Sequence, residues 1–364
     1  MPNPTERIRL VVLFGGVSAE HEVSCVTAAH VLQATDPTRY DVIPIGITRG
    51  GTWVRNDDAI AALAAGAQAI PDALEPVGTT VDPLPAMRPG TGLDELPVVV
   101  FPLLHGPHGE DGTVQGMLEL AGVPYVGTGV LGSSLCMDKA MAKRVADQTG
   151  IPQCRWIEHA ASDAETPAAL AERAAQELGF PIFVKPANMG SSVGITKAHD
   201  EAELAQAIDD ALAYDEVLVL EEGVAGRELE VGVLGDLEPE ASVAGEILPG
   251  AEFYDYDDKY LTGAAELRIP ADLPSSVRDE IRTLAVRTFS VMRCSGLARI
   301  DFFYEPDGRG VLLNEVNTIP GFTPSSMYPK LWEASGVSYG ALIDRLVALA
   351  IQRHDRRGGF STKR

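Results

Sequence analysis

The chain has 364 residues, of which 45% are hydrophobic and 22% charged, and its formal net charge at pH 7 is −23. This length exceeds one ordinary hydrophobic core and predicts two or three domains. The acidic balance argues against nucleic-acid binding, which requires a basic surface, and no apolar run is long enough to predict a membrane span or a signal peptide.

The N-terminal region alternates predicted strands with predicted helices. Leu10–Phe14, Val42–Ile47 and Pro97–Leu104 are apolar runs that each end at a polar loop. This pattern is typical of a parallel α/β sheet, in which ligands bind at the carboxyl ends of the strands. Gly15–Gly16 forms a turn after the first strand, and Ser18 is the predicted N-cap of the following helix. The turn lacks the GxGxxG fingerprint of dinucleotide-binding proteins.

The chain between the second strand and residue 150 is less regular. Residues 57–94 are rich in Ala, Pro and Gly without a clear period, which predicts a surface insertion. A helix is predicted to begin near Thr113, and Pro124–Gly127 is predicted to be a short strand. Cys136–Thr149 is predicted to be one helix that leads into a new domain at about residue 140.

A second region, from Ile151, has the pattern of an α+β unit. Helices are predicted over Glu165–Leu178 and Glu201–Leu212, and strands over Phe180–Pro186 and Glu216–Leu220.

A third region begins near Gly226. Its predicted elements are strands over Glu228–Leu234 and Ser242–Leu248, a loop over Gly250–Gly263, helices over Ser275–Arg293 and Gly340–Arg353, and a disordered basic tail over Arg356–Arg364. We therefore expect three domains, spanning residues 1–139, 140–225 and 226–364.

A β-hairpin is predicted near the end of the third region. The β-branched and aromatic runs Leu297–Tyr304 and Val311–Val316 flank the turn signal Pro306–Gly308. Side chains two residues apart on a strand share a face, so Arg299 and Asp301 point the same way.

The return strand offers a matching polar face, because Glu315 and Asn317 are also two residues apart. If the two faces coincide, two carboxylates, an amide oxygen and a guanidinium converge. Such oxygen ligands suit Mg²⁺, and an adjacent arginine suits an oxyanion or a phosphoryl group. For Arg299 and Asp301 alone, a solvated face with ordinary ion pairs is the alternative. Adding the second pair and the Pro320–Gly321 turn favours a magnesium and phosphate site.

Other segments carry weaker chemical signals. Gly190–Gly194, after the strand that ends near Lys185, has the small residues of a phosphate-covering loop, although it is not a Walker A sequence and a flexible turn is the alternative. Lys139 also lies at the edge of an ordered element. Glu221–Val224 is either a purine-binding linker or an acidic turn. Tyr254–Tyr260, dense in aromatics and charge, is either a lid that excludes water or a surface loop.

The cysteine pattern bears on the cellular compartment. Cys25, Cys136, Cys154 and Cys294 are scattered without CxxC spacing. Such cysteines are typical of reduced, mostly buried thiols, so we expect a cytoplasmic protein.

Seven segments together resemble a known family. In chain order they are GGVSAEHEVS (15–24), HGPHGEDGTVQG (105–116), MDK (137–139), KPANMGSSVG (185–194), YDYDDKY (254–260), ARIDFF (298–303) and NEVNTIPGFTPSSMYP (314–329). Their order and content resemble the D-alanine–D-alanine ligases of the ATP-grasp superfamily, across nearly the whole chain.

The resemblance implies a fold that combines α/β and α+β parts, namely an ATP-grasp fold preceded by an N-terminal parallel α/β (pre-ATP-grasp) domain. It implies ATP-dependent joining of two D-alanines to D-alanyl-D-alanine for peptidoglycan synthesis, through an acyl phosphate. ATP is then a substrate, and two Mg²⁺ (or Mn²⁺) ions are cofactors; activation by a monovalent cation stays open. The expected partner is D-alanine, with neither nucleic acid nor membrane, and a homodimer is a family expectation.

The resemblance also implies roles for individual residues in binding ATP and metal. The phosphates would be contacted by Lys139, Lys185, Ser192 and Lys259. The adenine and ribose would be contacted by Glu221, Glu222, Val224 and Glu228. The metal ions would be held by Asp301, Glu315 and Asn317.

The remaining implied roles concern the amino acid substrates. The ammonium of the first D-alanine would be bound by Glu20, hydrogen-bonded to Ser191 and Tyr260, with His105 beside the same pocket. The oxyanion of the tetrahedral intermediate would be stabilised by Arg299 and the N–H of Gly321. The carboxylate of the second D-alanine would be bound by Ser326 and the backbone of Met327.

Two positions bear on how far the resemblance extends. Phe322 stands where methionine is commoner in the family, which should affect packing more than chemistry. Lys259 and Tyr260 favour an amine acceptor, because relatives that make D-alanyl-D-lactate carry a different lid there. The alternatives are another ATP-grasp ligase, such as a depsipeptide or L-amino-acid ligase, and an inactive nucleotide-binding module. The intact set of metal ligands argues against the inactive module.

Overall fold

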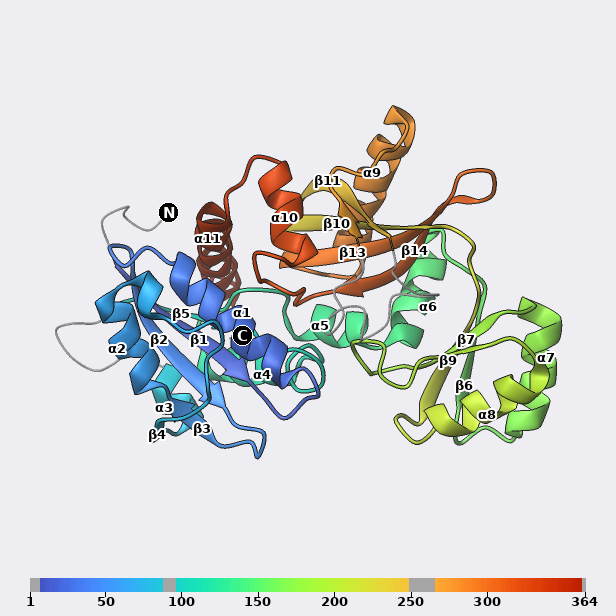
Figure 1. The fold of residues 1–364 in the computed structure, drawn as a ribbon, viewed down its shortest axis with the longest axis horizontal. Coiled ribbons are helices and arrows are strands. Elements are labelled where there is room, and N and C mark those ends of the chain that lie inside the picture. Colours follow the sequence, from blue (N-terminus) through green and yellow to red (C-terminus); the bar gives the residue numbers. More distant parts are fainter. Residues whose placement is uncertain (1–6, 88–95, 249–265, 362–364) are drawn as a thin grey trace.

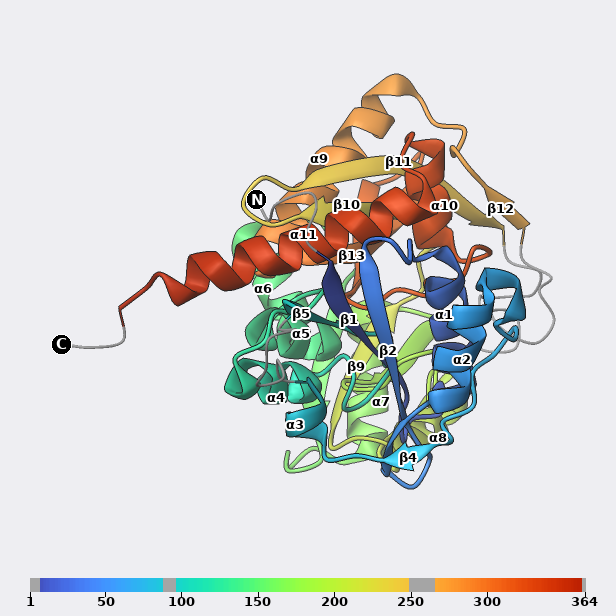
Figure 2. The ribbon, with the colours of Figure 1, turned by 90° about the vertical axis from the view of Figure 1, so that its left-hand side faces the viewer.

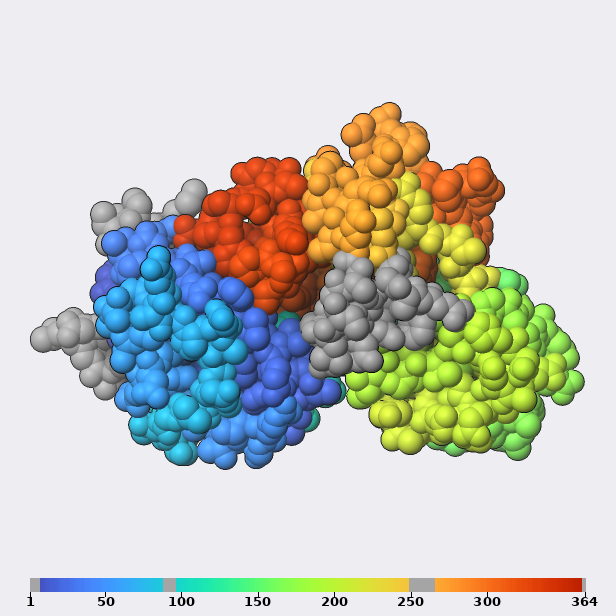
Figure 3. All heavy atoms as spheres, in the orientation of Figure 1, coloured from blue at the N-terminus to red at the C-terminus, as the bar shows by residue number. Residues whose placement is uncertain are grey.

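The computed structural model describes residues 7–87, 96–248 and 266–361. The chain forms three parts, each built on its own sheet (Figure 1). In the space-filling view the N-terminal part (blue) and the middle part (green) form lobes on either side, and the C-terminal part (orange and red) lies above them (Figure 3). The predicted domain limits near residues 139 and 225 stay predictions.

The first sheet has the strand order β4-β3-β2-β1-β5. Its central strand β1 (Ile8–Gly15) is parallel to both β2 (Tyr40–Ile47) and β5 (Val98–Pro102), which confirms the predicted parallel pattern. β3 (Trp53–Arg55) and β4 (Thr79–Thr80) extend the sheet in antiparallel fashion. The predicted strand near residue 125 is reduced to an isolated bridge with β5.

Several helices in the chain up to residue 149 begin or end elsewhere than predicted. They are α1 (His21–Ala34), α2 (Asp57–Ala65), the 3₁₀ turn η1 (Ala67–Ala69), α3 (Pro83–Met87), α4 (Thr113–Ala121), α5 (Val130–Met137) and α6 (Lys139–Thr149). The predicted N-cap at Ser18 is wrong. Its hydroxyl accepts a hydrogen bond from the N–H of Glu20 in a tight turn, and the helix begins only afterwards.

The single helix predicted over Cys136–Thr149 is also wrong, because the chain breaks at Asp138. That residue has an extended backbone (φ −81°, ψ 101°), and its carboxylate accepts a hydrogen bond from the N–H of Met141 at 2.9 Å. Asp138 therefore caps a new helix, α6, whose first residue is Lys139. The break separates α5 from α6 and places Lys139 at the N-terminus of α6.

Most of residues 57–87 lie at the surface, as composition predicts, but a few apolar side chains anchor the segment to the first sheet. Ile70, Leu74 and Met87 are at most 5% exposed and pack into the cores beside the first sheet. Short elements each bury only one or two apolar side chains, so no period is visible in the sequence.

The second sheet is antiparallel, with the order β6-β9-β7-β8. Its elements are β6 (Trp156–Ala160), α7 (Pro167–Leu178), β7 (Ile182–Pro186), β8 (Thr196–Ala198), α8 (Glu201–Ala211) and β9 (Val217–Glu222). α7 and α8 cover one face of this sheet and share a core with it (Figure 1). The opposite face of this sheet is directed toward the third part of the chain (Figure 1).

The third sheet is also antiparallel, with the order β12-β11-β10-β13-β14. Its strands are β10 (Arg227–Gly235), β11 (Glu240–Leu248), β12 (Glu266–Arg268), β13 (Gly296–Glu305) and β14 (Gly310–Asn317). The accompanying helices are α9 (Ser275–Val291), α10 (Met327–Ala334) and α11 (Tyr339–Gly358).

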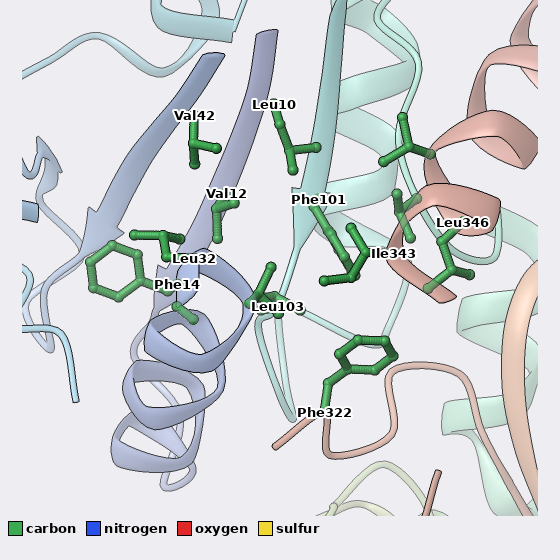
Figure 4. Close-up of a cluster of buried hydrophobic side chains, with 14 of the residues drawn as sticks. Leu10, Val12, Phe14, Leu32, Val42, Phe101, Leu103, Phe322, Ile343 and Leu346 are labelled. Atoms are coloured by element: carbon green, nitrogen blue, oxygen red, sulfur yellow. The ribbon is translucent and has the colours of Figure 1, made fainter. Parts of the chain in front are cut away.

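The last helix joins the first and third parts. Figure 2 shows α11 crossing over the first sheet, and Figure 4 shows Ile343 and Leu346 of this helix packed with Leu10 and Phe101 of the sheet. The helix continues to residue 358, so the predicted disorder from Arg356 onward is wrong for its last turn. Basic side chains there interact favourably with the helix dipole.

Among the described residues, no single helix is both long and apolar enough to cross a membrane. The bent pair α10 and α11, at 102° to each other, meets the length and composition criteria only when the two helices are taken together.

Candidate active site

The hairpin β13–β14 brings four polar side chains together. In its register Arg299 faces Asn317, and Asp301 faces Glu315, so the two polar faces coincide as the alternation predicts. The register shifts immediately after Asp301, where Asn314 forms a bulge. Bulges increase local twist and are common next to active sites.

Arg299 is held by two carboxylates. Its Nε and Nη2 donate to the two oxygens of Asp301 at 2.8 and 2.7 Å, and its Nε lies 3.0 Å from Glu230. Burial lowers the pKa of Arg299, but these carboxylates outweigh burial and raise it well above its usual value. Nη1 donates no hydrogen bond to a described residue, which leaves a fixed cationic donor for an oxyanion.

Glu230 is a site residue that the sequence reasoning missed. It lies on β10 directly opposite Asp301 and is 4% exposed. Its signal was present, because it is two residues after Glu228 and therefore shares that residue's face of the strand.

The hairpin fits divalent cations by the chemistry of its donors. Asp301 and Glu315 offer four carboxylate oxygens from adjacent strands, and Asn317, two residues after Glu315, adds an amide oxygen that also accepts a hydrogen bond from the N–H of Ile319 at 3.1 Å. Each carboxylate oxygen has two lone pairs, so the bonds from Arg299 to Asp301 leave positions for a metal. Hard oxygen donors of this kind suit Mg²⁺ or Mn²⁺. The described residues contain no compact cluster of three or more His, Cys, Asp or Glu, so the metal shell would need other oxygens.

Two of the predicted phosphate-binding lysines lie at the second sheet and the start of α6. Lys139 Nζ donates to the carbonyl of Met189 at 2.6 Å, and burial lowers its pKa. Lys185 Nζ donates to Glu221 at 2.7 Å. Burial alone would lower the pKa of Lys185, but the charge of Glu221 raises it above its usual value, so Lys185 remains an ammonium.

The small-residue loop after β7 has an unusual backbone. Ser191 and Ser192 have φ angles of 49° and 61°, a left-handed conformation that costs a non-glycine residue free energy and recurs at functional sites. The hydroxyl of Ser191 hydrogen-bonds Glu20, the residue before α1. This contact connects the covering loop with the N-terminal part.

Buried polar side chains surround that contact. Glu20 and His105 are 7% and 5% exposed, and Nε2 of His105 has no hydrogen-bond partner among the described residues. Burial lowers the pKa of His105, although the charge of Glu20 opposes this effect. The pocket can therefore accept a small polar group that bonds both side chains.

Glu110, in the same pocket, was also missed. Its carboxylate accepts a hydrogen bond from the N–H of Gly106 at 2.7 Å. Burial and then the charge of Glu20 raise its pKa to about 8. Only its place in the segment 105–116 could have drawn attention to it, because nothing in a lone loop glutamate distinguishes it from a solvated one.

The predicted adenine linker follows β9. The side chain of Glu222 is bound by the N–H and Nε of Arg155, both at 2.7 Å, and by Arg309. The side chain of Glu221 is turned to Lys185. Neither carboxylate is therefore directed at a base, and the backbone around Val224 is the part of this segment that can contact one.

The predicted anion-binding residues near residue 321 lie at the start of α10. The hydroxyl of Ser326 accepts a hydrogen bond from the N–H of Thr323 at 3.1 Å and lies against Gly321. Met327 is the first residue of the helix, and no side chain caps it. Its N–H is therefore one of the donors that a carboxylate can bind at a helix N-terminus.

Two adjoining cavities collect these residues. The larger, about 890 Å³, is lined by Glu20, His105, Glu110, Lys139, Ser191, Ser192, Arg299, Glu315, Asn317, Gly321, Ser326 and Met327, among others. The second, about 550 Å³, is lined by Lys185, Ser192, Glu221, Glu222, Val224, Glu228, Glu230, Arg299, Asp301 and Glu315, among others. The two share several lining residues. Lys259 and Tyr260 lie outside the described residues.

Comparison with known families matches both halves of the chain. A family model described as D-ala D-ala ligase N-terminus matches residues 9–128, and one described as D-ala D-ala ligase C-terminus matches residues 145–348. A D-alanine–D-alanine ligase of Geobacillus kaustophilus is 47% identical over 360 residues, covering 96% of each chain. One of Bacillus licheniformis is 48% identical over 368 residues, covering 96% of this chain and 98% of the relative.

Solved structures agree with the sequence comparison. The D-alanine–D-alanine ligase of Coxiella burnetii superposes with a TM-score of 0.81 at 35% identity, covering 97% of this chain and 96% of that one. The VanG D-Ala:D-Ser ligase of Enterococcus faecalis superposes with a TM-score of 0.79 at 36% identity, covering 95% and 100%.

Proposed function

We propose, because this chain belongs to the D-alanine–D-alanine ligase family, that it joins two D-alanines to D-alanyl-D-alanine in an ATP-dependent reaction that serves peptidoglycan synthesis. In this reaction the carboxylate of one D-alanine takes the γ-phosphoryl group of ATP. The amine of a second D-alanine then attacks the acyl phosphate, and phosphate leaves. The observation that carries this proposal is the pair of adjoining cavities, which together contain every described residue that the family resemblance assigns to the site.

The first D-alanine would lie in the pocket around Glu20. The buried carboxylate can bind its ammonium, and the hydrogen bond from Ser191 holds that carboxylate in place. Nε2 of His105 offers a further hydrogen-bonding atom in the same pocket. This arrangement would direct the substrate carboxylate toward the hairpin, where the phosphoryl group arrives.

ATP would occupy the second cavity, between the second and third sheets. Lys139 and Lys185, which line the two cavities, would contact its phosphates, and the Val224 backbone and Glu228, which line the second, would contact adenine and ribose. Asp301, Glu315 and Asn317 would hold two divalent cations, which we propose to be Mg²⁺ or Mn²⁺. When bound, these ions would neutralise charge on the transferred phosphoryl group.

Two fixed donors would act on the second step. As the amine attacks, negative charge develops on the former carboxyl oxygen. Arg299 and Gly321 border the larger cavity, where Nη1 of Arg299 and the N–H of Gly321 would stabilise that charge without reorganising, which is the usual source of electrostatic catalysis. Ser326 and the N-terminus of α10 would hold the acceptor's carboxylate.

The choice of acceptor is the finer part of the proposal. A D-Ala:D-Ser ligase is among the similar structures, so D-serine is a specific second candidate, and D-lactate is the depsipeptide alternative. We propose an amine acceptor, D-alanine, because Lys259 and Tyr260 are present in the sequence. The burial of all four cysteines as free thiols supports a reducing, cytoplasmic setting. A homodimer and monovalent-cation activation remain expectations from the family.

The test is a product analysis by mass spectrometry with ATP and Mg²⁺. Reactions would contain D-alanine alone, L-alanine alone, or D-alanine with equimolar D-serine or D-lactate. D-alanyl-D-alanine should form from D-alanine alone and remain the main product in the mixtures. If a mixed product dominates, the protein is instead a ligase for that acceptor, D-serine or D-lactate. If no product forms in any reaction, the ligase assignment is contradicted.

A further inference from the structure

Behind the proposed phosphate site lies a buried lysine that neither cavity touches. Lys143, on α6 one turn after Lys139, is 4% exposed and lines neither the 890 Å³ nor the 550 Å³ cavity. Its Nζ lies 3.1 Å from one carboxylate oxygen of Glu221. The other oxygen of Glu221 accepts the 2.7 Å hydrogen bond from Lys185. Glu221 therefore bridges two lysines, of which only Lys185 reaches the cavity.

The formal charges of the Lys143–Glu221–Lys185 bridge matter because the bridge is buried away from water. Glu221 is 3% exposed, and among the described residues its bridge has one further polar neighbour, the Cys154 thiol, 3.5 Å from Lys143 Nζ and 3.6 Å from the carboxylate. Two ammonium groups and one carboxylate have a formal sum of +1. Without Lys143 the sum would be zero, and the field of Lys185 at the cavity would be largely cancelled by its own partner.

The ionisation states support this sum. Burial raises the pKa of Glu221, but the charges of Lys143 and Lys185 outweigh burial and lower that pKa to about 2. The carboxylate therefore stays charged and keeps its hold on Lys185. A buried carboxylate with one lysine would anchor that lysine but would also neutralise it.

We propose that Lys143 is a positioning residue that supplies the compensating charge, so that Glu221 can orient Lys185 while Lys185 keeps a net positive field for the phosphates of ATP. The inference rests on the proposed function, in which Lys185 contacts those phosphates. Lys143 itself does not contact the nucleotide in this proposal. The effect of Lys143 on ligand binding should therefore depend on the phosphate charge of the ligand alone.

The test compares two ligands in the full-length protein. Affinity would be measured for the non-hydrolysable ATP analogue AMP-PNP with Mg²⁺, and for adenosine, which lacks phosphates. Lys143→Met keeps the length of the side chain and removes its charge, and it should weaken AMP-PNP about tenfold, equivalent to one close charge interaction. Adenosine affinity should stay within about twofold. Equal weakening of both ligands would show a structural role and overturn the proposal.

A second variant restores the charge sum by another route. In Lys143→Met with Glu221→Gln, the bridge loses one positive and one negative charge and again sums to +1. AMP-PNP affinity of this double variant should exceed that of Lys143→Met, and Lys143→Arg, which keeps the charge, should retain the wild-type affinity within about threefold. A double variant no better than Lys143→Met would contradict charge compensation. If Lys143→Met does not fold, Lys143→Gln takes its place beside the charge-keeping Lys143→Arg, and equal AMP-PNP affinity in these two variants overturns the proposal.

The wild type separates this inference from the function on which it rests. Wild-type protein that fails to bind AMP-PNP would contradict the proposed ATP site itself. Wild-type binding with no selective loss in Lys143→Met would contradict only the role of Lys143.

Discussion

The hydroxyl of Ser191 hydrogen-bonds the carboxylate of Glu20, a residue 171 positions earlier in the chain. Ser191 belongs to the loop after β7, and Glu20 precedes the first helix of the N-terminal part. The contact therefore connects segments that follow strands of two different sheets, and both of its residues line the larger cavity. A substrate that binds Glu20 is positioned by both parts of the protein at once.

Replacing Glu20 by glutamine should remove the charge that binds the substrate ammonium while keeping the side-chain shape. We expect kcat/KM for D-alanine to fall about 100-fold, since hydrogen bonds to charged groups contribute about 1.5–3 kcal/mol. The KM for ATP should change by less than about threefold. Steady-state kinetics with Glu172→Gln, an exposed position on α7, as control would measure both. An unchanged KM for D-alanine in Glu20→Gln would show that Glu20 does not bind the substrate ammonium.

Asp301→Asn should abolish turnover, because it removes a proposed metal ligand and one of the two carboxylates that hold Arg299. We expect kcat to fall by about 10³-fold or more. Asp307→Asn, in the exposed turn of the same hairpin, should leave activity unchanged. Circular dichroism would establish that both variants fold. Activity of Asp301→Asn at ordinary Mg²⁺ concentrations would refute the metal assignment.

Stability should depend on the ionisation of Glu221. Because its pKa is lowered in the folded protein from 4.5 to about 2, its charge stabilises the fold above about pH 5. That contribution, about 3 kcal/mol, is lost as the pH falls from about 5 to about 2. The midpoint of thermal unfolding should therefore fall less steeply with acidification in Glu221→Gln than in the wild type. Parallel curves would show that the bridge adds no pH-dependent stability.

Phe322 should matter for stability through the core between the first sheet and α11. Its ring is 1% exposed and lies near Phe101 in the core (Figure 4). The distances from its ring centroid to those of Phe101 and Tyr339 are 5.8 and 5.2 Å. Phe322→Ala removes these contacts at a cost of about 3–5 kcal/mol and should lower the thermal midpoint by about 5 °C or more. Phe360→Ala, at an exposed position, should leave it unchanged. Equal thermal midpoints for Phe322→Ala and the wild type would contradict the role of Phe322 in this core.

The parts of this fold that the sequence predicted are those with a regular period. Alternation along the hairpin placed Arg299 beside Asp301, and the register puts Glu315 opposite Asp301. The parallel strands of the first sheet were equally visible as uninterrupted apolar runs. Both signals depend on residues close in the chain, which is why one sequence suffices to read them.

The missed features depend on contacts between distant segments. Nothing near Lys143 shows that it is buried against Glu221, 78 positions later, because a helical lysine normally lies in solvent. Glu110 likewise becomes unusual only where the fold brings it to Glu20. The break at Asp138, in contrast, could have been predicted, since aspartate before a helical lysine segment is a typical N-cap.

The measurement that tests the central claim most directly follows oxygen from D-alanine to phosphate. D-alanine labelled with ¹⁸O in both carboxyl oxygens would be incubated with ATP and Mg²⁺, and the released phosphate and dipeptide analysed by mass spectrometry. Reaction through an acyl phosphate transfers one labelled oxygen to each phosphate, with one phosphate for each D-alanyl-D-alanine. Phosphate released without label, or without an equal amount of dipeptide, would contradict this account.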